Sequence, residues 1–185
     1  MHVGYFYTWW RGDGLPDLEP FPELKIEQSH DVELLARLSD LPESTIQKRI
    51  DLGNRPYLAW IDESPAAYGW SAWEHMEIGE LGVEIELPDG DHYLWDFRTL
   101  PDFRGRGIYP HMLQAIILAE KTIAKRFWIG HDLDNIASFK GIRKAGIPVI
   151  GEVWLRDGVP VCIGHEPRVR SEMAARLLSL PFEMR

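Results

Sequence analysis

The stretch Tyr93–Ile117, YLWDFRTLPDFRGRGIYPHMLQAII, decides the fold of this chain. Its first part, residues 93–99, predicts a β-strand. The residues from Tyr109 onward predict a long helix with Pro110 in the first turn, where the missing N–H is harmless. The apolar side chains of this helix fall on one face: Met112, Leu113, Ile116, Ile117 and Ile123. A short loop joins the two elements and carries Arg104, Gly105, Arg106 and Gly107.

This loop suits an anionic ligand. The first N–H groups of a helix lack intrahelical partners, and the aligned peptide dipoles place partial positive charge there. Gly105 and Gly107 have no Cβ to block an approach to the backbone, and Arg104 and Arg106 can add charge-assisted hydrogen bonds. The same residues also fit a tight turn with surface arginines. The P-loop pattern and the third glycine of the Rossmann fingerprint are both missing.

Together with its surroundings, the loop resembles the cofactor motif of the GNAT superfamily of N-acyltransferases. That motif reads Q/R-x-x-G-x-G/A and follows a strand and a Pro-containing loop. Arg104 and Gly107 match it, and Leu100–Phe103 is similar to the approach loop. Tyr109 stands where the family has a small residue.

A second match to this family lies downstream. Asn135, Ser138 and the run Lys144-Ala145-Gly146 resemble the Asn-containing helix that lines the other side of the cofactor. Asn135 also suits the N-cap of a helix, and the two roles are compatible. Many relatives carry a tyrosine acid four residues before the closing glycine, where this chain has Ile142.

The rest of the chain predicts helices and strands in mixed order. A cap at Ser29 and a terminator at Gly53 mark the first two helices, and Asp157-Gly158 marks the turn of a closing hairpin. We expect a strand at residues 83–87 to continue the sheet into residues 93–99. The other predicted helices and strands are helices at 32–38, 42–53, 136–142 and 173–180, and strands at 57–61, 67–73, 127–129, 149–155 and 159–163.

The resemblance implies a GNAT-like α+β fold, with a central, mostly antiparallel twisted sheet flanked by about four helices. A length of 185 residues allows one sizeable core, so we expect a single domain over residues 1–185. The resemblance covers residues 29–165. Residues 1–28 form an N-terminal extension or a first strand, in which Trp9 and Trp10 are candidates to cover an acceptor cleft, and residues 166–185 contain a C-terminal helix.

The resemblance also implies that acetyl-CoA binds and coenzyme A leaves. The sheet splays between two neighbouring strands to admit the pantetheine arm, which pairs with the backbone of Phe97, Arg98 and Thr99. Asn135 and Ser138 line the other side. The pyrophosphate lies beside Arg104 on the amides of Gly105, Arg106, Gly107, Ile108 and Tyr109. An amine then attacks the thioester carbonyl in a ternary complex, and a strand amide stabilises the oxyanion.

Deprotonation of that amine is the main chemical demand, because an alkyl amine with a pKa of ~10.4 lies roughly three units above neutral pH. Strict alternation would place one set of side chains on a common strand face: Asp91, Tyr93, Trp95, Phe97 and Thr99. Because the family often places catalytic groups on the face that contacts the cofactor arm, the resemblance suggests Asp91 and Tyr93 as candidate catalytic groups, with Glu86 in reserve. A turn carboxylate and a packed tyrosine are the alternative interpretation.

The charge of the chain argues against some partners and favours others. A net charge of −9 argues against nucleic acid, whose phosphates are neutralised by Lys and Arg, and favours a cationic partner. Acidic side chains gather at Glu74, Glu77, Glu80, Glu84, Glu86, Asp89 and Asp91, where they either attract an amine or form a solvated edge. We expect a small-molecule or peptide amine as acceptor, and a monomer or homodimer.

Other classes of protein fit less well. No apolar run approaches the ~20 residues of a membrane span, and the first residues lack a secretory signal, so we expect a cytoplasmic protein without membrane contact. The seven histidines show no metal-binding spacing, so we expect no metal. Cys162, in VPVCIG, suits a buried strand thiol better than a nucleophile. The predicted function is N-acetyl transfer, and the alternative, which Tyr109 and Ile142 favour, is a noncatalytic acyl-CoA sensor.

Overall fold

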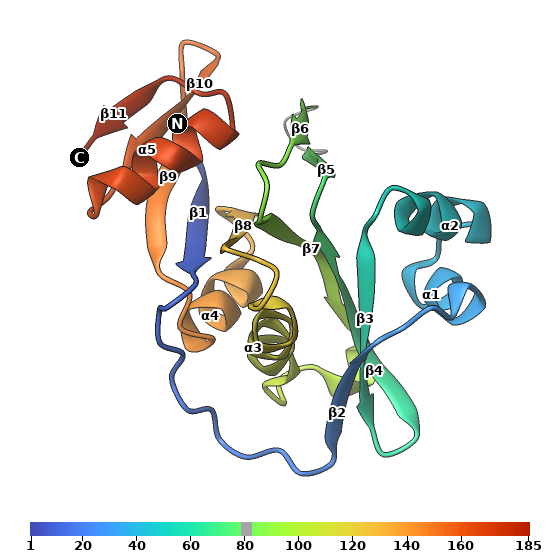
Figure 1. The fold of residues 1–185 in the computed structure, drawn as a ribbon. Coiled ribbons are helices and arrows are strands. Elements are labelled where there is room, and N and C mark those ends of the chain that lie inside the picture. The colour runs from blue at the N-terminus through green and yellow to red at the C-terminus, as the bar shows by residue number, and fades with distance from the viewer. Residues whose placement is uncertain (79–82) are drawn as a thin grey trace.

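The computed structural model describes residues 1–78 and 83–185 (Figure 1). Its strands are β1 (His2–Trp10), β2 (Leu24–Gln28), β3 (Arg55–Ile61), β4 (Ser64–Ala72), β5 (His75–Ile78), β6 (Val83–Glu86), β7 (Asp91–Thr99), β8 (Arg126–Asp132), β9 (Val149–Arg156), β10 (Val159–Gly164) and β11 (Phe182–Met184). Nine of them form one sheet in the order β11-β10-β9-β1-β8-β7-β4-β3-β2. Only the neighbours β7–β8 and β10–β11 are parallel among the described pairs. The expected mostly antiparallel sheet is confirmed.

Helices cover both faces of this sheet (Figure 1). The described residues contain α1 (Val32–Ser39), α2 (Glu43–Asp51), α3 (Ile108–Glu120), α4 (Ile136–Lys144), α5 (Arg168–Leu177) and a 3-10 turn, η1 (Pro101–Phe103). On β3, Leu58 packs with α1 and α2, whereas its neighbour Tyr57 packs under α3. On β8, Phe127 packs under α3 and α4, and Trp128 packs with α5. Helices α3 and α4 therefore lie on one face, and α1, α2 and α5 on the other.

The N-terminal residues form an internal strand of the sheet. β1 pairs antiparallel with β8 on one side and with β9 on the other. Its apolar run does not alternate because both of its faces are buried: Phe6 packs toward α5, and Tyr7 and Trp9 pack under α3. The expectation that Trp9 covers an acceptor cleft is wrong, because its ring packs in the core with its centroid 5.8 Å from that of Phe127.

β5 and β6 form a separate two-stranded hairpin. The expectation that residues 83–87 continue the main sheet is therefore wrong. Met76 and Ile85 pack with the core on the α5 side, so this hairpin buries apolar side chains without pairing to a strand of the main sheet. Of the acidic stretch, Glu80 lies outside the described residues.

The element boundaries that differ from the predicted ones include those of α1, α3 and α5. Asp31 caps α1 by accepting a hydrogen bond from a first-turn N–H at 2.9 Å, so Ser29 is not the cap. α3 ends at Glu120, and Ile123 beyond it is 54% exposed rather than part of the apolar face. α5 spans residues 168–177, and the chain continues into β11, which the sequence patterns did not reveal.

A bulge at Asp96 reverses the faces of β7. Asp96 has φ +48°, and the register with β4 shifts between Tyr68 and Trp70. As a result Leu94 and Phe97, three residues apart, both pack under α3. The strict alternation assumed for this strand is therefore wrong, and the side chains before and after the bulge do not share one face: Asp91, Tyr93 and Trp95 on one side of it, Phe97 and Thr99 on the other.

The described residues show little that points to other kinds of site. None of their helices has the length and apolarity that crossing a membrane requires. No group of three His, Cys, Asp or Glu side chains among them is placed to hold a metal ion. Cys162 is buried in β10, and this burial raises its pKa to about 11, which disfavours the nucleophilic thiolate.

Candidate functional site

A cavity of about 440 Å³ opens where β7 and β8 separate. The described pairing between these strands runs from Asp91↔Arg126 to Tyr93↔Trp128 and stops there. Beyond this point both strands line the cavity, together with the start of β1 and with α3 and α4. The main lining residues are 4–6, 93–97, 129–132, Tyr109, Asn135 and Ser138. The cavity thus lies at the splay between neighbouring strands.

The loop before α3 has the geometry to hold an anion. Gly105 and Gly107 have φ +78° and +80°, and a Cβ on Gly105 would meet nothing within 4 Å. Gly107 is the N-cap of α3 and gives it no side-chain cap. Arg104 and Arg106 are exposed beside it, and the ammonium of Lys144 lies 3.7 Å from where a Gly107 Cβ would be. Helix donors and three cations therefore surround one small surface.

The side chain of Tyr109 extends from α3 and contacts both α4 and β7. A Cβ on Gly141 of α4 would fall 2.2 Å from Tyr109 Cδ1, so the ring lies directly on this glycine. The rings of Tyr109 and Phe97 have centroids 5.3 Å apart. The Phe97 ring in turn lies on Gly69, whose Cβ would be 2.2 Å from it. Two glycines therefore make room for two rings that line the cavity, which explains how a large residue fits where the family motif has a small one.

Polar side chains converge near the point where the strands part. His131 Nε2 lies 2.9 Å from the Tyr7 hydroxyl, and His131 Nδ1 lies 2.7 Å from the carbonyl oxygen of Asp132. Because a carbonyl oxygen only accepts, Nδ1 carries the proton and Nε2 accepts from Tyr7. Burial lowers the pKa of His131 and raises the pKa of both Tyr7 and Tyr109. At neutral pH the imidazole is therefore neutral and both phenols are protonated.

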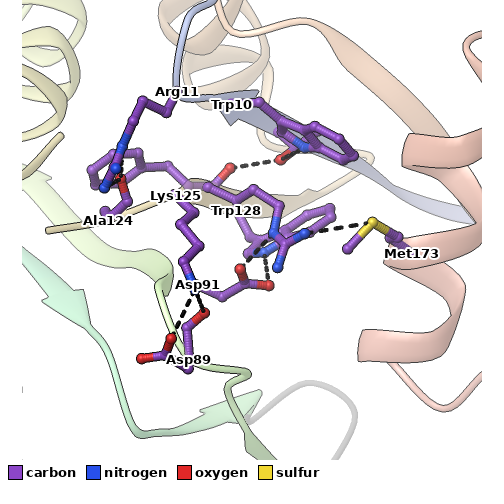
Figure 2. Close-up of polar contacts among 11 residues, drawn as sticks. Trp10, Arg11, Asp89, Asp91, Ala124, Lys125, Trp128 and Met173 are labelled. Carbon is purple, nitrogen blue, oxygen red and sulfur yellow. Dashed lines mark hydrogen bonds and ion pairs between the residues drawn. The ribbon is translucent and has the colours of Figure 1, made fainter. Parts of the chain in front are cut away.

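Asp91 is held in a buried ion pair (Figure 2), and it is not among the residues that line this cavity. Its Oδ1 accepts from Arg126 Nε at 2.6 Å, and its Oδ2 accepts from Trp128 Nε1 at 2.9 Å. Arg126 also contacts the Met173 sulfur at 3.7 Å. These contacts join the start of β7 to β8 and α5. Glu86 is exposed on the β5–β6 hairpin.

Asn135 and Ser138, which the resemblance suggests as cofactor contacts, lie side by side at the start of α4. Asn135 Oδ1 accepts from the backbone N–H of Ser138 at 3.0 Å, so Asn135 caps α4, and both residues also line the cavity. On β7, Arg98 and Thr99 pair with β4 through one edge. The opposite edge, which faces β8, has no strand partner beyond Tyr93 among the described pairs.

The cavity also contains residues that the sequence analysis missed. Tyr5 and His131 line it, as does Asp96, whose Oδ2 accepts from Arg49 NH1 of α2 at 2.6 Å. Tyr5 was missed because β1 was not assigned to the sheet. His131 lies two residues beyond the predicted strand at 127–129, and extending that strand by its period of two would have placed it on the face of Phe127.

Comparisons with known proteins bear on the fold. No family model and no curated protein match the sequence. An acetyltransferase from the GNAT family of Colwellia psychrerythraea has a TM-score of 0.55 and 17% identity, over 80% of this chain and 53% of that one. A GCN5-related N-acetyltransferase from Kribbella flavida has a TM-score of 0.50 and 15% identity, over 80% and 54%. An aminoglycoside N(6')acetyltransferase from Legionella pneumophila has a TM-score of 0.51 and 21% identity, over 76% and 88%.

At these identities the likeness shows the fold: this chain has the fold of GNAT acetyltransferases, as the cofactor motif implied. The chain spans only about half the length of the first two of these proteins.

The acyl-CoA ligand expected from the cofactor motif fits the residues present. The uncapped start of α3, the open space above Gly105 and the cations of Arg104, Arg106 and Lys144 suit a diphosphate. The free edge of β7 and the cavity beside it suit an extended arm with amide groups.

Proposed function

Because the chain has the GNAT fold, we propose that it is an N-acetyltransferase that moves the acetyl group of acetyl-CoA to a primary amine of a small molecule or peptide. The observation that carries the proposal is the position of one cavity. It begins beside the uncapped, glycine-rich start of α3 and reaches the gap between β7 and β8. A ligand with a diphosphate at one end and a reactive group at the other fits this arrangement.

In this proposal the chain holds the donor at two places. The amides of residues 105–109, with Arg104 and Lys144, bind the diphosphate, and Asn135 and Ser138 line the opposite wall. The backbone of residues 97–99 pairs with the pantetheine arm along the free edge of β7. When bound, acetyl-CoA supplies a thioester carbonyl, and the chain orients the amine toward it.

The same cavity offers groups for the proton of the amine. Of the three predicted catalytic side chains, Tyr93 lines the cavity, whereas Asp91 and Glu86 are not among its lining residues. We keep Tyr93 as the side chain that contacts the reacting centre. His131 is neutral near pH 7 and accepts from Tyr7, so this pair is the proton acceptor that the proposal names.

The acceptor is a cationic amine in this proposal. Asp96, at the bulge of β7, places a carboxylate on the cavity wall, although Arg49 partly neutralises it. The chain as a whole has a net charge of −9, which favours the approach of a cation. The name of the Legionella protein with this fold specifies an aminoglycoside, which supports an amine as the acceptor.

The second candidate is a noncatalytic acyl-CoA-binding sensor. The observation that favours it is the pair of departures from the family motif, Tyr109 in the cavity wall and Ile142 in the core. An assay of acetyl-CoA consumption over a panel of amines, with detection of the acetylated product by mass, separates the two. Turnover of an amine supports the enzyme. Tight binding of acetyl-CoA without transfer to any amine supports the sensor.

A further inference from the structure

The proposed function does not say which group stabilises the sulfur of coenzyme A as it leaves. When the amine nitrogen bonds to the carbonyl carbon, the carbon–sulfur bond breaks and its electron pair stays on sulfur. The nitrogen passes its proton to the His131 side of the cavity and from there to solvent, and the sulfur later takes a proton from solvent. Until then a thiolate lies in a partly buried cavity, where a hydrogen-bond donor lowers its free energy strongly.

Tyr109 is placed to be that donor. It is the second residue of α3, so its backbone belongs to the predicted diphosphate site, while its ring lies on Gly141 and lines the cavity. A hydrogen bond with the Ser138 side chain acts on its hydroxyl, and the Tyr7 and Tyr93 hydroxyls lie near enough to raise its pKa further. The Tyr109 side chain therefore shares the cavity wall with Tyr93 and Ser138.

The α4 position that carries a tyrosine in the family motif has no such group here. Ile142 is fully buried in the core under α3 and has no proton to donate. The next residue toward the helix start, Gly141, is the one on which the Tyr109 ring lies. A tyrosine from α3 thus reaches across to α4 beside the isoleucine. Both departures from the motif, Tyr109 and Ile142, therefore occur at the same contact between α3 and α4.

Three other polar side chains at this place have partners of their own. His131 directs Nδ1 to the carbonyl of Asp132 and Nε2 to Tyr7. Asp96 is an acceptor and pairs with Arg49. Asn135 uses its side-chain oxygen to cap α4. Tyr109 is a phenol whose burial keeps it protonated, which is the state that donates.

We propose, on the basis of the proposed function, that the Tyr109 hydroxyl is a catalytic group that donates a hydrogen bond to the sulfur of coenzyme A as the carbon–sulfur bond breaks. It stabilises the thiolate without giving up its own proton, because a thiol with a pKa of ~8.5 is a much weaker base than a buried phenolate. The site therefore holds the leaving group in its charged form.

Tyr109→Phe tests this proposal, because the variant keeps the ring on Gly141 and removes the oxygen alone. The first readout is the pKa of the thiol of coenzyme A bound to the protein, followed by ultraviolet absorbance of the thiolate across pH. We expect the wild-type protein to lower this pKa relative to free coenzyme A, and Tyr109→Phe to raise it back by about one to two units. The second readout is kcat, which we expect to fall about 10- to 100-fold while the affinity for coenzyme A stays within about twofold.

Tyr57→Phe is the matched control. Its hydroxyl donates to Glu120 at 2.9 Å and lines a different pocket on the β2 and β3 side of α3. We expect this variant to leave both readouts unchanged at a temperature where it is folded. Tyr109→Ala tests the alternative that the ring blocks part of the coenzyme A site. In that case removing the ring would tighten the binding of coenzyme A.

The outcomes separate the two proposals. A bound thiol whose pKa is the same in the wild-type protein and in Tyr109→Phe overturns the role of Tyr109 and leaves the proposed function standing. Tighter binding of coenzyme A by Tyr109→Ala, together with an unchanged thiol pKa in Tyr109→Phe, also overturns the role of Tyr109 as a donor. That result would show that the ring blocks part of the coenzyme A site. No binding of coenzyme A to the wild-type protein overturns both.

Discussion

Replacing Gly107 by valine places a branched side chain at the start of α3, where the diphosphate is proposed to lie. Gly107 has φ +80°, a conformation that costs a residue with a Cβ about 1–2 kcal/mol. The native protein has room for the added Cβ, whose nearest neighbour would be the Lys144 ammonium at 3.7 Å. For a chain of this length the melting temperature should therefore fall by only about 2–8 °C, and the fold should survive.

Binding of coenzyme A should suffer far more than stability. Hydrogen bonds to a charged group contribute about 1.5–3 kcal/mol each, so blocking two helix amides weakens binding by about 3–6 kcal/mol, or at least about 100-fold. Titration calorimetry with coenzyme A measures this loss. Gly158→Val is the control, because Gly158 has φ +80° with nothing within 4 Å and lies in the distant β9–β10 turn. It should lose the same stability and keep its affinity. Equal affinities in the two variants would refute the placement of the diphosphate.

Three further predictions follow from the packing of the site and the core. Glu120→Gln should lower the free energy of unfolding by about 3–5 kcal/mol and the melting temperature by about 6–20 °C, because the buried carboxylate accepts from Tyr57, Ser71 and His92; a thermal melt that matches the wild type would contradict this. Burial lowers the pKa of His131 below its ordinary 6.5, so the unfolded chain binds this proton more readily and stability should fall as pH drops below about 6.5; denaturant unfolding across pH should show a flatter profile for His131→Gln, and an identical profile would count against the assignment. Gly141→Ala should destabilise the protein by about 1–3 kcal/mol and reduce turnover, because the new Cβ would lie 2.2 Å from Tyr109; chemical denaturation that shows the stabilisation of about 1 kcal/mol usual for this change in a helix would argue against the observed packing.

The local patterns were sufficient to predict the elements that carry their own signals. The glycines and arginines before α3, the Asp157-Gly158 turn and the two strands of the closing hairpin all lie where the sequence predicts them. These features depend on contacts between near neighbours in the chain. A positive φ at a turn glycine and an apolar stripe on a helix can be predicted from the local sequence without knowledge of the rest of the fold.

The missed features depend on distant contacts. β1 is covered on both faces, so its aromatic run carries no alternation to identify it as a strand. The bulge at Asp96 looks like an ordinary polar residue in a strand, yet it decides which side chains share the face of Phe97. Tyr7 and His131 are 124 positions apart, and only the pairing of β1 with β8 brings them together.

A crystal structure of the protein with coenzyme A tests the central claim most directly. The account predicts a diphosphate over residues 105–109 and a pantetheine arm along the free edge of β7, with its sulfur near Tyr109. Coenzyme A bound anywhere else on the molecule, or no bound coenzyme A in crystals soaked at saturating concentration, would contradict it.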